Sequence, residues 1–409
     1  MLLTVGFKLM EMNRFMTAAG KLNRSARNAA RRSRIRIVTA LQRDHAATLN
    51  RGLRFLCLLL KPLFLRTTCG FVPSLFLSFW SAALLTEVAS AAAAPVRVRL
   101  GTLAPKGSSS YKHVLAMGDK WKQSSGGSAT LTIYADGTMG GEADMVRRMR
   151  IGQLQAGMLT AVGLSEIEPG VTGLQHLPMM FRSLEEVDYI GEKLRPTLEK
   201  RLLEKGFVVL FWGDAGWVRF FSKTPVLRPD DLKRTKLFSW AGNPAQVDIY
   251  KSAGFDPVPL ETVDILPNLQ TGLITAVPVP PFVALATQID GPAPHMLELN
   301  WAPLVGATVV TKKTWDSIPA AAHPHLLKAA QEAGSLIKAD NRRESSEAVE
   351  AMKKRGLKVH AVTPEIESEW RRATEAVYPK IRGGIVPADI FDEVARLLKD
   401  YRAAQEGAK

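Results

Sequence analysis

From Pro95 onward, segments with the two-residue period of a strand alternate with segments that have the spacing of a helix. Residues 96–104 and 129–135 alternate apolar and polar side chains, as half-buried strands do. Residues 110–125 and 183–206 instead carry apolar residues at helical spacing. This alternation predicts an α/β fold with a mostly parallel sheet and right-handed crossovers.

The second half of the chain repeats this style. Residues 207–213, 218–223 and 235–240 are predicted to be separate strands. Residues 321–356 then read as one helix of about 30 residues, roughly 45 Å long at the usual rise per residue. A helix of that length is expected to span two lobes rather than lie inside one.

The N-terminal part, residues 1–94, differs in character and is predicted to be a basic leader with a signal segment. Residues 71–85 form an uncharged run of 15 residues, which follows basic residues and precedes a stretch rich in alanine. The run is short for a membrane-spanning helix, which needs roughly 20 residues. We therefore predict a secretory signal over residues 52–94 with cleavage near Ala91 or Ala94, and a periplasmic location. An uncleaved anchor is the alternative.

The charge of the protein is concentrated in the same leader. Residues 1–94 hold 14 Lys and Arg against three acidic residues, and the remainder holds 40 against 36. The basic stretch within residues 1–50 is open to two interpretations, a nucleic-acid or lipid contact and a start codon assigned too far upstream. The body is close to neutral, so we expect no nucleic-acid partner there.

The body also lacks the residue patterns of known catalytic chemistry. Both cysteines, Cys57 and Cys69, precede it, which excludes thiol catalysis and a disulfide framework in the body. The patterns GxSxG, HExxH and GxxxxGK[ST] are absent from the sequence. His323 and His325 flank a proline at an expected helix start, where a structural role is favoured over metal binding. We expect a protein that is not an enzyme and needs neither metal nor cofactor.

Four segments carry a family resemblance, at residues 137–159, 177–187, 228–237 and 269–277. In this order and spacing they resemble the DctP-type solute-binding subunits of TRAP (tripartite ATP-independent periplasmic) transporters. The resemblance covers essentially all of residues 97–400. It implies a two-lobed α/β periplasmic binding protein fold with hinge strands and a long lobe-spanning helix. It also implies that the lobes close on a small molecule and deliver it to a TRAP-type membrane permease.

The resemblance divides the body into two lobes, each built from two stretches of chain. The expected lobe I comprises residues 95–215 plus 304–343, and the expected lobe II comprises residues 216–303 plus 344–409.

The family's ligand-binding arginines are replaced in this sequence. Most members place an arginine that pairs with a ligand carboxylate where this chain has Phe238. A second family arginine aligns with Val218, and Arg219 stands one residue further on. Because side chains alternate across a strand, that shift sends Arg219 to the opposite face.

Other polar positions of the family site also carry apolar or less polar residues in this sequence. An asparagine position is occupied by Val279, and Leu103, Gly141 and Thr160 stand where some relatives carry Asn, Asp and Glu. Asn243 begins a helix that faces the expected cleft and could equally cap that helix. The candidate ligand-binding residues are Leu103, Gly141, Thr160, Trp217, Val218, Arg219, Phe238, Trp240, Asn243 and Val279.

These replacements predict an apolar or aromatic ligand. Burying a carboxylate without a cation costs several kcal/mol, whereas apolar burial contributes roughly 25 cal/mol per Å². Two alternatives stay open: an organic-acid-binding subunit that uses the shifted Arg219, and a periplasmic carrier of a hydrophobic molecule that has no permease.

Overall fold

The computed structural model of the chain describes residues 94–407. The predicted signal segment and the cleavage position near Ala91 lie outside the described residues, and Ala94 is the first of them. Within 94–407, no helix has the length and apolar character needed to cross a bilayer.

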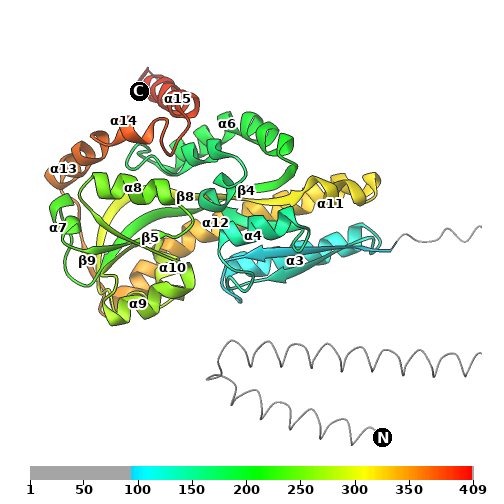
Figure 1. Cartoon of the computed structure of the whole chain (residues 1–409), viewed down its shortest axis with the longest axis horizontal. Helices are drawn as coiled ribbons and strands as arrows, with labels where there is room; N and C mark the ends of the chain where they lie inside the picture. Colours follow the sequence, from blue (N-terminus) through cyan, green and yellow to red (C-terminus); the bar gives the residue numbers. More distant parts are fainter. Residues whose placement is uncertain (1–93, 408–409) are drawn as a thin grey trace, which may run out of the picture. The chain divides into compact units, whose positions relative to one another are not determined.

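A nine-stranded sheet forms the centre of the described structure, with the order β2-β1-β3-β8-β4-β7-β5-β6 and with β9 on a further edge of β8 (Figure 1). The strands are β1 (Val96–Thr102), β2 (Ala129–Tyr134), β3 (Ala156–Thr160), β4 (Phe207–Ser222), β5 (Lys236–Trp240), β6 (Asp256–Leu260), β7 (Ala276–Val279), β8 (His295–Thr311) and β9 (Lys358–His360).

The sheet is mixed. The pairs β1–β2, β1–β3, β5–β6, β5–β7 and β8–β9 are parallel, as the sequence predicted for most of the sheet. The central strands β4 and β8 run antiparallel to each other, and β4 meets β7, and β8 meets β3, in antiparallel fashion. The sequence did not predict these antiparallel pairs, which arise because the two long strands run in opposite directions.

Strand β4 joins two segments that were predicted to be separate strands. It runs without interruption for 16 residues. Register irregularities against β8 between Asp214 and Trp217 and between Val218 and Phe220 replace the expected break. Gly216 sits in one of them with φ of 72°, a conformation that favours glycine.

Helices cover both faces of the sheet, and several begin at the side-chain caps expected of helix starts, such as Ser108 before α3 and Ser183 before α6. The helices are α3 (Ser109–Ser124), α4 (Glu142–Arg150), α5 (Ala161–Ser165), η2 (Pro169–Leu174), α6 (Leu184–Glu204), α7 (Pro229–Lys233), α8 (Pro244–Ser252), η3 (Thr262–Asp264), α9 (Ile265–Thr271), α10 (Pro281–Ala286), α11 (Lys312–Ser317), η4 (Ala320–Ala322), α12 (His323–Lys354), α13 (Pro364–Glu375), α14 (Tyr378–Ile381) and α15 (Ala388–Gly407).

The long helix α12 confirms the prediction of a lobe-spanning helix. It has 32 residues and runs along β4 (Figure 1). Its first half packs into one core through residues such as Leu326 and Ala330, and its second half packs into another through Val349 and Met352. One helix therefore belongs to the cores of both lobes.

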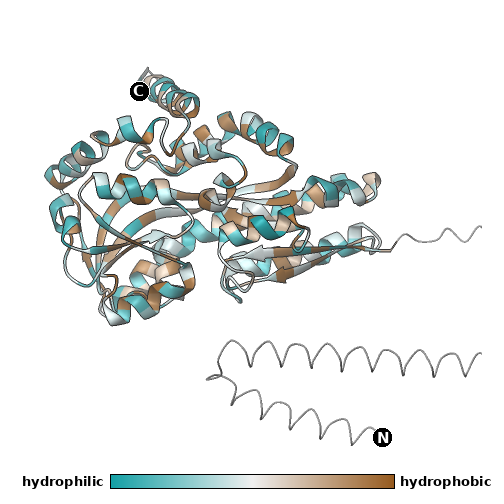
Figure 2. Ribbon diagram, in the orientation of Figure 1, coloured by the Kyte–Doolittle hydropathy of each residue, from teal (hydrophilic) through white to brown (hydrophobic). Residues whose placement is uncertain are grey.

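Four apolar cores stabilise the two lobes, and Figure 2 shows hydrophobic strands beneath helices whose outer faces are largely hydrophilic. The last helix of the described chain joins the same core as α6. Ile390, Val394 and Leu397 of α15 pack with Leu194 and Leu198 of α6. The division of the chain into two lobes stays a prediction.

Candidate ligand-binding cleft

A cavity lies where β5 ends, between α8, α13 and the middle of β8. Among the candidate residues, Val218, Phe238 and Trp240 line it. In α/β folds, ligands usually bind beyond the carboxyl ends of strands, and the end of β5 occupies such a place here.

Aromatic side chains form much of the cavity wall. The rings of Phe238 and Trp240 meet edge to face with centroids 4.4 Å apart. Trp301 and Trp370 also line the cavity, and both pack against Phe220 beneath it, at 5.1 and 5.4 Å between centroids. Such aromatic pairs add about 0.5–1.5 kcal/mol each beyond area burial, so this wall is rigid as well as apolar.

The cavity is uncharged at neutral pH. Its lining includes no Asp, Glu, Lys or Arg. Burial lowers the pKa of His176 to about 4, against a smaller opposite effect of the Thr172 carbonyl. Burial also raises the pKa of Tyr250 to about 12. Both titratable lining groups are therefore neutral at pH 7.

Arg219 and Trp217 lie on a different side of β4 from Val218. They line a second cavity, between β4 and α12, together with Arg342. The Arg219 guanidinium donates to Glu298 Oε1 at 3.2 Å and to Asn300 Oδ1 at 3.4 Å. The structure thus separates these two candidates from the apolar cavity, because neighbouring residues of a strand point to opposite faces.

Val279 and Asn243 have mainly structural contacts. Val279 is 1% exposed and is buried in the core that also contains Phe238. Unlike Phe238, it does not line the cavity. Asn243 caps α8, since its Oδ1 accepts from the backbone N–H of Gln246 at 3.0 Å. Its Nδ2 lies 3.1 Å from His176 Nε2, at the edge of the cavity.

The candidates of the first lobe surround a smaller cavity that shares Trp240 with the large one. Leu103 and Thr160 line it, together with Glu142. The Glu142 carboxylate accepts from the Thr160 backbone N–H at 2.7 Å and hydroxyl at 2.6 Å, and from the Gly163 N–H at 2.9 Å. Burial raises the pKa of Glu142, while these hydrogen bonds oppose the rise. Thr160 is therefore engaged inside the protein.

Gly141 lies where the two halves of the molecule touch. A Cβ atom at this position would come 2.2 Å from Glu261 Oε2, so any larger residue would displace the Glu261 carboxylate. Burial raises the pKa of Glu261, and the nearby Asp144 and Asp264 add to the rise. Gly141 thus permits a close approach of the segment before η3 to the start of α4.

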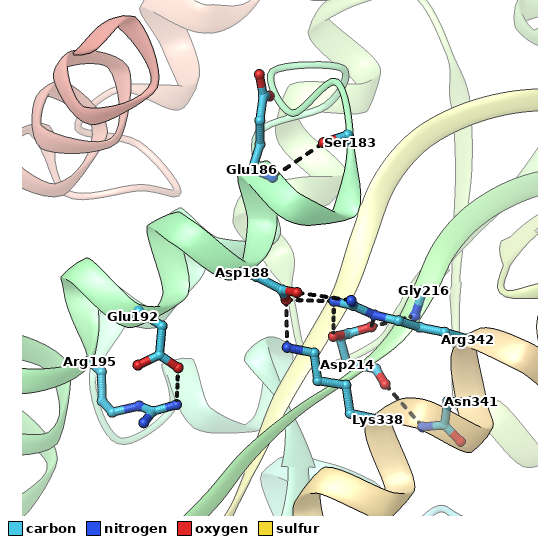
Figure 3. Close-up of polar contacts among 10 residues, drawn as sticks. All are labelled: Ser183, Glu186, Asp188, Glu192, Arg195, Asp214, Gly216, Lys338, Asn341 and Arg342. Atoms are coloured by element: carbon cyan, nitrogen blue, oxygen red, sulfur yellow. Dashed lines mark hydrogen bonds and ion pairs between the residues drawn. The ribbon is translucent and has the colours of Figure 1, made fainter. Parts of the chain in front are cut away.

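An ion-pair network joins the long helix to the crossing strand (Figure 3). Arg342 of α12 donates to both oxygens of Asp188 on α6, at 3.0 and 2.6 Å, and to Asp214 of β4 at 3.0 and 2.7 Å. Lys338 reaches Asp188 at 2.6 Å, and Asn341 donates to the Asp214 carbonyl at 3.0 Å. The network fixes α12 on β4 and α6 next to the place where the strand crosses between lobes.

Sequence reasoning missed several cavity residues, among them Gln175, His176, Tyr250, Trp301 and Trp370. They come from four distant segments, and none lies in a motif of its own. A tryptophan inside a strand or helix reads as a packing residue, so no local signal singles these residues out.

The fold and the cleft define a two-lobed solute-binding protein. The model of the DctP family, described as bacterial extracellular solute-binding protein, family 7, matches residues 100–383, well over half of the chain. The chain belongs to this family. Its members are extracellular or periplasmic solute-binding proteins rather than enzymes, and they act with membrane permease components.

Individual relatives are distant but cover most of the body. An uncharacterized protein of Haemophilus influenzae is 26% identical over 282 residues, which is 67% of this chain and 84% of that protein. The 2,3-diketo-L-gulonate-binding periplasmic protein YiaO of Escherichia coli is 25% identical, covering 61% and 76%. A TRAP periplasmic solute-binding protein of Sulfurospirillum deleyianum with bound succinate superimposes with a TM-score of 0.68 at 19% identity, covering 74% of this chain and 98% of that one. The last likeness supports the two-lobed fold.

Proposed function

We propose that this protein captures a small molecule with a mainly apolar body and presents it to a TRAP-type permease. The observation that carries the proposal is the uncharged aromatic cavity at the end of β5. Val218 and Phe238 line that cavity, so the positions that align with the family's arginines face it with apolar side chains. A carboxylate buried there would lack a cation, which costs several kcal/mol. An apolar body would instead be stabilised by roughly 25 cal/mol per Å².

An organic acid is the second candidate ligand, and the comparisons favour it over an apolar one. The relative from Escherichia coli is named for a sugar acid, and the Sulfurospirillum structure holds succinate. In this chain, such a ligand would require Arg219 to leave Glu298 and reach the face of β4 that carries Val218. Alternatively, it would bind in the second cavity, where Arg219 and Arg342 lie.

We further propose export through the signal segment, with the mature chain beginning after Ala91 or Ala94. Strand β1 begins at Val96, so either cleavage would leave the described fold whole. Sequencing the N-terminus of protein recovered from the periplasm tests this. A chain that still begins at Met1 and stays with the membrane fraction would support an anchor instead. A permease gene beside this one would favour the transporter subunit over a carrier that works alone.

The ligand class is tested by mass spectrometry of the processed protein, purified from the periplasm without detergent and extracted under denaturing conditions. We expect a co-purifying apolar molecule that raises the melting temperature when added back. Phe238→Arg should abolish that gain, and Trp240→Ala should weaken it without placing a charge in the core. Arg219→Ala serves as the matched control and should leave the gain unchanged.

The opposite pattern would establish the organic-acid candidate. If succinate or a sugar acid raises the melting temperature, and Arg219→Ala removes that effect while Trp240→Ala does not, the apolar proposal is wrong.

A further inference from the structure

Gln175 carries a donor on the apolar cavity that has no partner within the described protein, and this donor narrows the ligand class. Gln175 is 8% exposed and lines the cavity. Its Oε1 accepts from the Val305 backbone N–H at 3.0 Å. A backbone N–H can only donate, so this contact fixes which end of the amide is oxygen. The Gln175 NH₂ group must therefore point the other way, and no hydrogen-bond acceptor of the described protein is paired with it.

Two polar side chains at the edge of the cavity, Asn243 and His176, are engaged with each other. Asn243 Oδ1 accepts from the Gln246 N–H, which leaves Asn243 Nδ2 to donate to His176 Nε2 at 3.1 Å. The lone pair of His176 is thereby occupied. Ser239 Oγ contacts Gln246 Oε1 at 3.4 Å, which directs the Gln246 NH₂ group away from Ser239.

The remaining polar groups of the wall are of two kinds. The indole N–H groups of Trp240 and Trp301 can only donate, whereas the hydroxyl groups of Ser239, Tyr250 and Thr374 can also accept. The hydroxyl of Thr374 already donates to the Arg371 carbonyl at 2.8 Å. Among these groups, the Gln175 NH₂ is an amide donor without a partner in the described protein, and the wall around it is uncharged and mainly apolar.

We infer that the ligand carries an uncharged oxygen acceptor, such as a ketone, ester or aldehyde carbonyl, that receives a hydrogen bond from Gln175 Nε2. An amide NH₂ on the cavity wall that has no partner in the described protein gains a hydrogen bond when a ligand carbonyl oxygen reaches it. A carboxylate would also accept, but the absence of a cation from the described lining makes its burial unfavourable. This inference rests on the proposed function, because it assigns a chemical group to the ligand of the same cavity.

Three probes of nearly equal shape test it by calorimetry or NMR titration at pH 7: acetophenone, isopropylbenzene and benzoate. We expect acetophenone to bind about fivefold more tightly than isopropylbenzene, the effect of one net hydrogen bond between neutral groups. Benzoate should bind most weakly. In ¹⁵N-labelled protein, acetophenone should shift the side-chain amide resonance of Gln175, and isopropylbenzene should not.

The variant Gln175→Met removes the donor at similar size, and it should remove the preference for acetophenone while isopropylbenzene binds as before. Thr374→Val is the matched control, since it also removes a polar group from the wall but not a free donor, and should keep the preference. Circular dichroism establishes that both variants are folded. If Gln175→Met does not fold, the inference is tested by the Gln175 side-chain amide resonance of the unaltered protein, compared between acetophenone and isopropylbenzene.

The outcomes separate the inference from the proposed function. Equal binding of acetophenone and isopropylbenzene overturns the inference and leaves the apolar cleft standing. Preferential binding of benzoate overturns both in favour of an organic acid. If none of the three probes binds at millimolar concentration, the proposed apolar cleft fails and the inference fails with it.

Discussion

At the scale of single residues, the body contains a buried carboxylate whose role is to hold backbone in place. Glu142 is 8% exposed and ties the start of α4 to the end of β3 and to the first turn of α5. Its neighbour across this contact is Gly163, where a Cβ would lie 2.6 Å from Glu142 Cβ. A glycine and a buried carboxyl group together fix this corner of the first-lobe cavity.

We therefore predict that Glu142→Ala destabilises the protein by about 2 kcal/mol, because the buried N–H groups of Thr160 and Gly163 lose their acceptor. Urea unfolding followed by circular dichroism measures the change. Glu166→Ala is the control. Glu166 is exposed on the next turn of chain, and its loss should alter the free energy of unfolding by less than about 0.5 kcal/mol. Equal effects of the two substitutions would contradict the role given to Glu142.

At the scale of elements, the contact between α12 and β4 depends on a helical glycine. A Cβ at Gly334 would come 2.6 Å from the ring of Phe211, which is 7% exposed on β4. The long helix can lie this close to the strand because position 334 has no side chain. Gly191, inside α6, has no atom within 4 Å of such a Cβ.

These two glycines predict opposite effects of one substitution. Gly334→Ala should destabilise the protein by about 1–3 kcal/mol, since the Phe211 ring or the helix must move. Gly191→Ala should stabilise it by up to about 1 kcal/mol, because alanine favours the helix and meets nothing. Thermal unfolding of the two variants and the unaltered protein under identical conditions measures both changes in stability. A stabilising Gly334→Ala would mean that α12 does not pack on β4 as closely as described.

At the scale of the whole molecule, the Arg342 network links three elements that lie far apart in the chain. Burial disfavours the Asp188 carboxylate, but hydrogen bonds from Arg342 and Lys338 outweigh this and lower the pKa of Asp188. In turn, although burial alone would lower the pKa of Arg342, hydrogen bonds to Asp188 and Asp214 raise it. Because the network lies beside the crossing strand, it stabilises the region where the strand passes between the lobes, and Arg342 also forms part of the wall of the second cavity.

The network predicts a pH dependence of stability. A carboxyl group with a lowered folded-state pKa stabilises the fold above its ordinary value of 3.8 and loses that contribution as the pH falls through the lower folded value. Asp188→Asn should therefore melt at a lower temperature than the unaltered protein at pH 7, and the difference should shrink as the pH falls below 3.8 towards the lower folded-state pKa of Asp188. Glu192→Gln, at an exposed pair with Arg195 on the same helix (Figure 3), should follow the unaltered protein throughout. A difference that stays constant as the pH falls below 3.8 would contradict this account.

The sequence by itself determined the features that depend on local pattern. Strand and helix periods predicted the α/β fold, and 36 consecutive residues of helical character predicted the spanning helix that appears as α12. The replacement of family arginines by Val218 and Phe238 predicted apolar side chains at two positions that line the cavity. These are properties of neighbouring residues or of one aligned position, so they need no knowledge of distant contacts.

Only the tertiary structure decided which residues meet. The Gln175–Val305 hydrogen bond joins positions 130 residues apart, and Trp370 reaches the same cavity from a later helix. Strand alternation predicted that Arg219 faces away from Val218, but its pairing with Glu298 depends on the neighbouring strand β8. Contacts of this kind form when helices and strands pack together. The periodicity of apolar residues predicts which face of an element is buried, but not which other element packs against it.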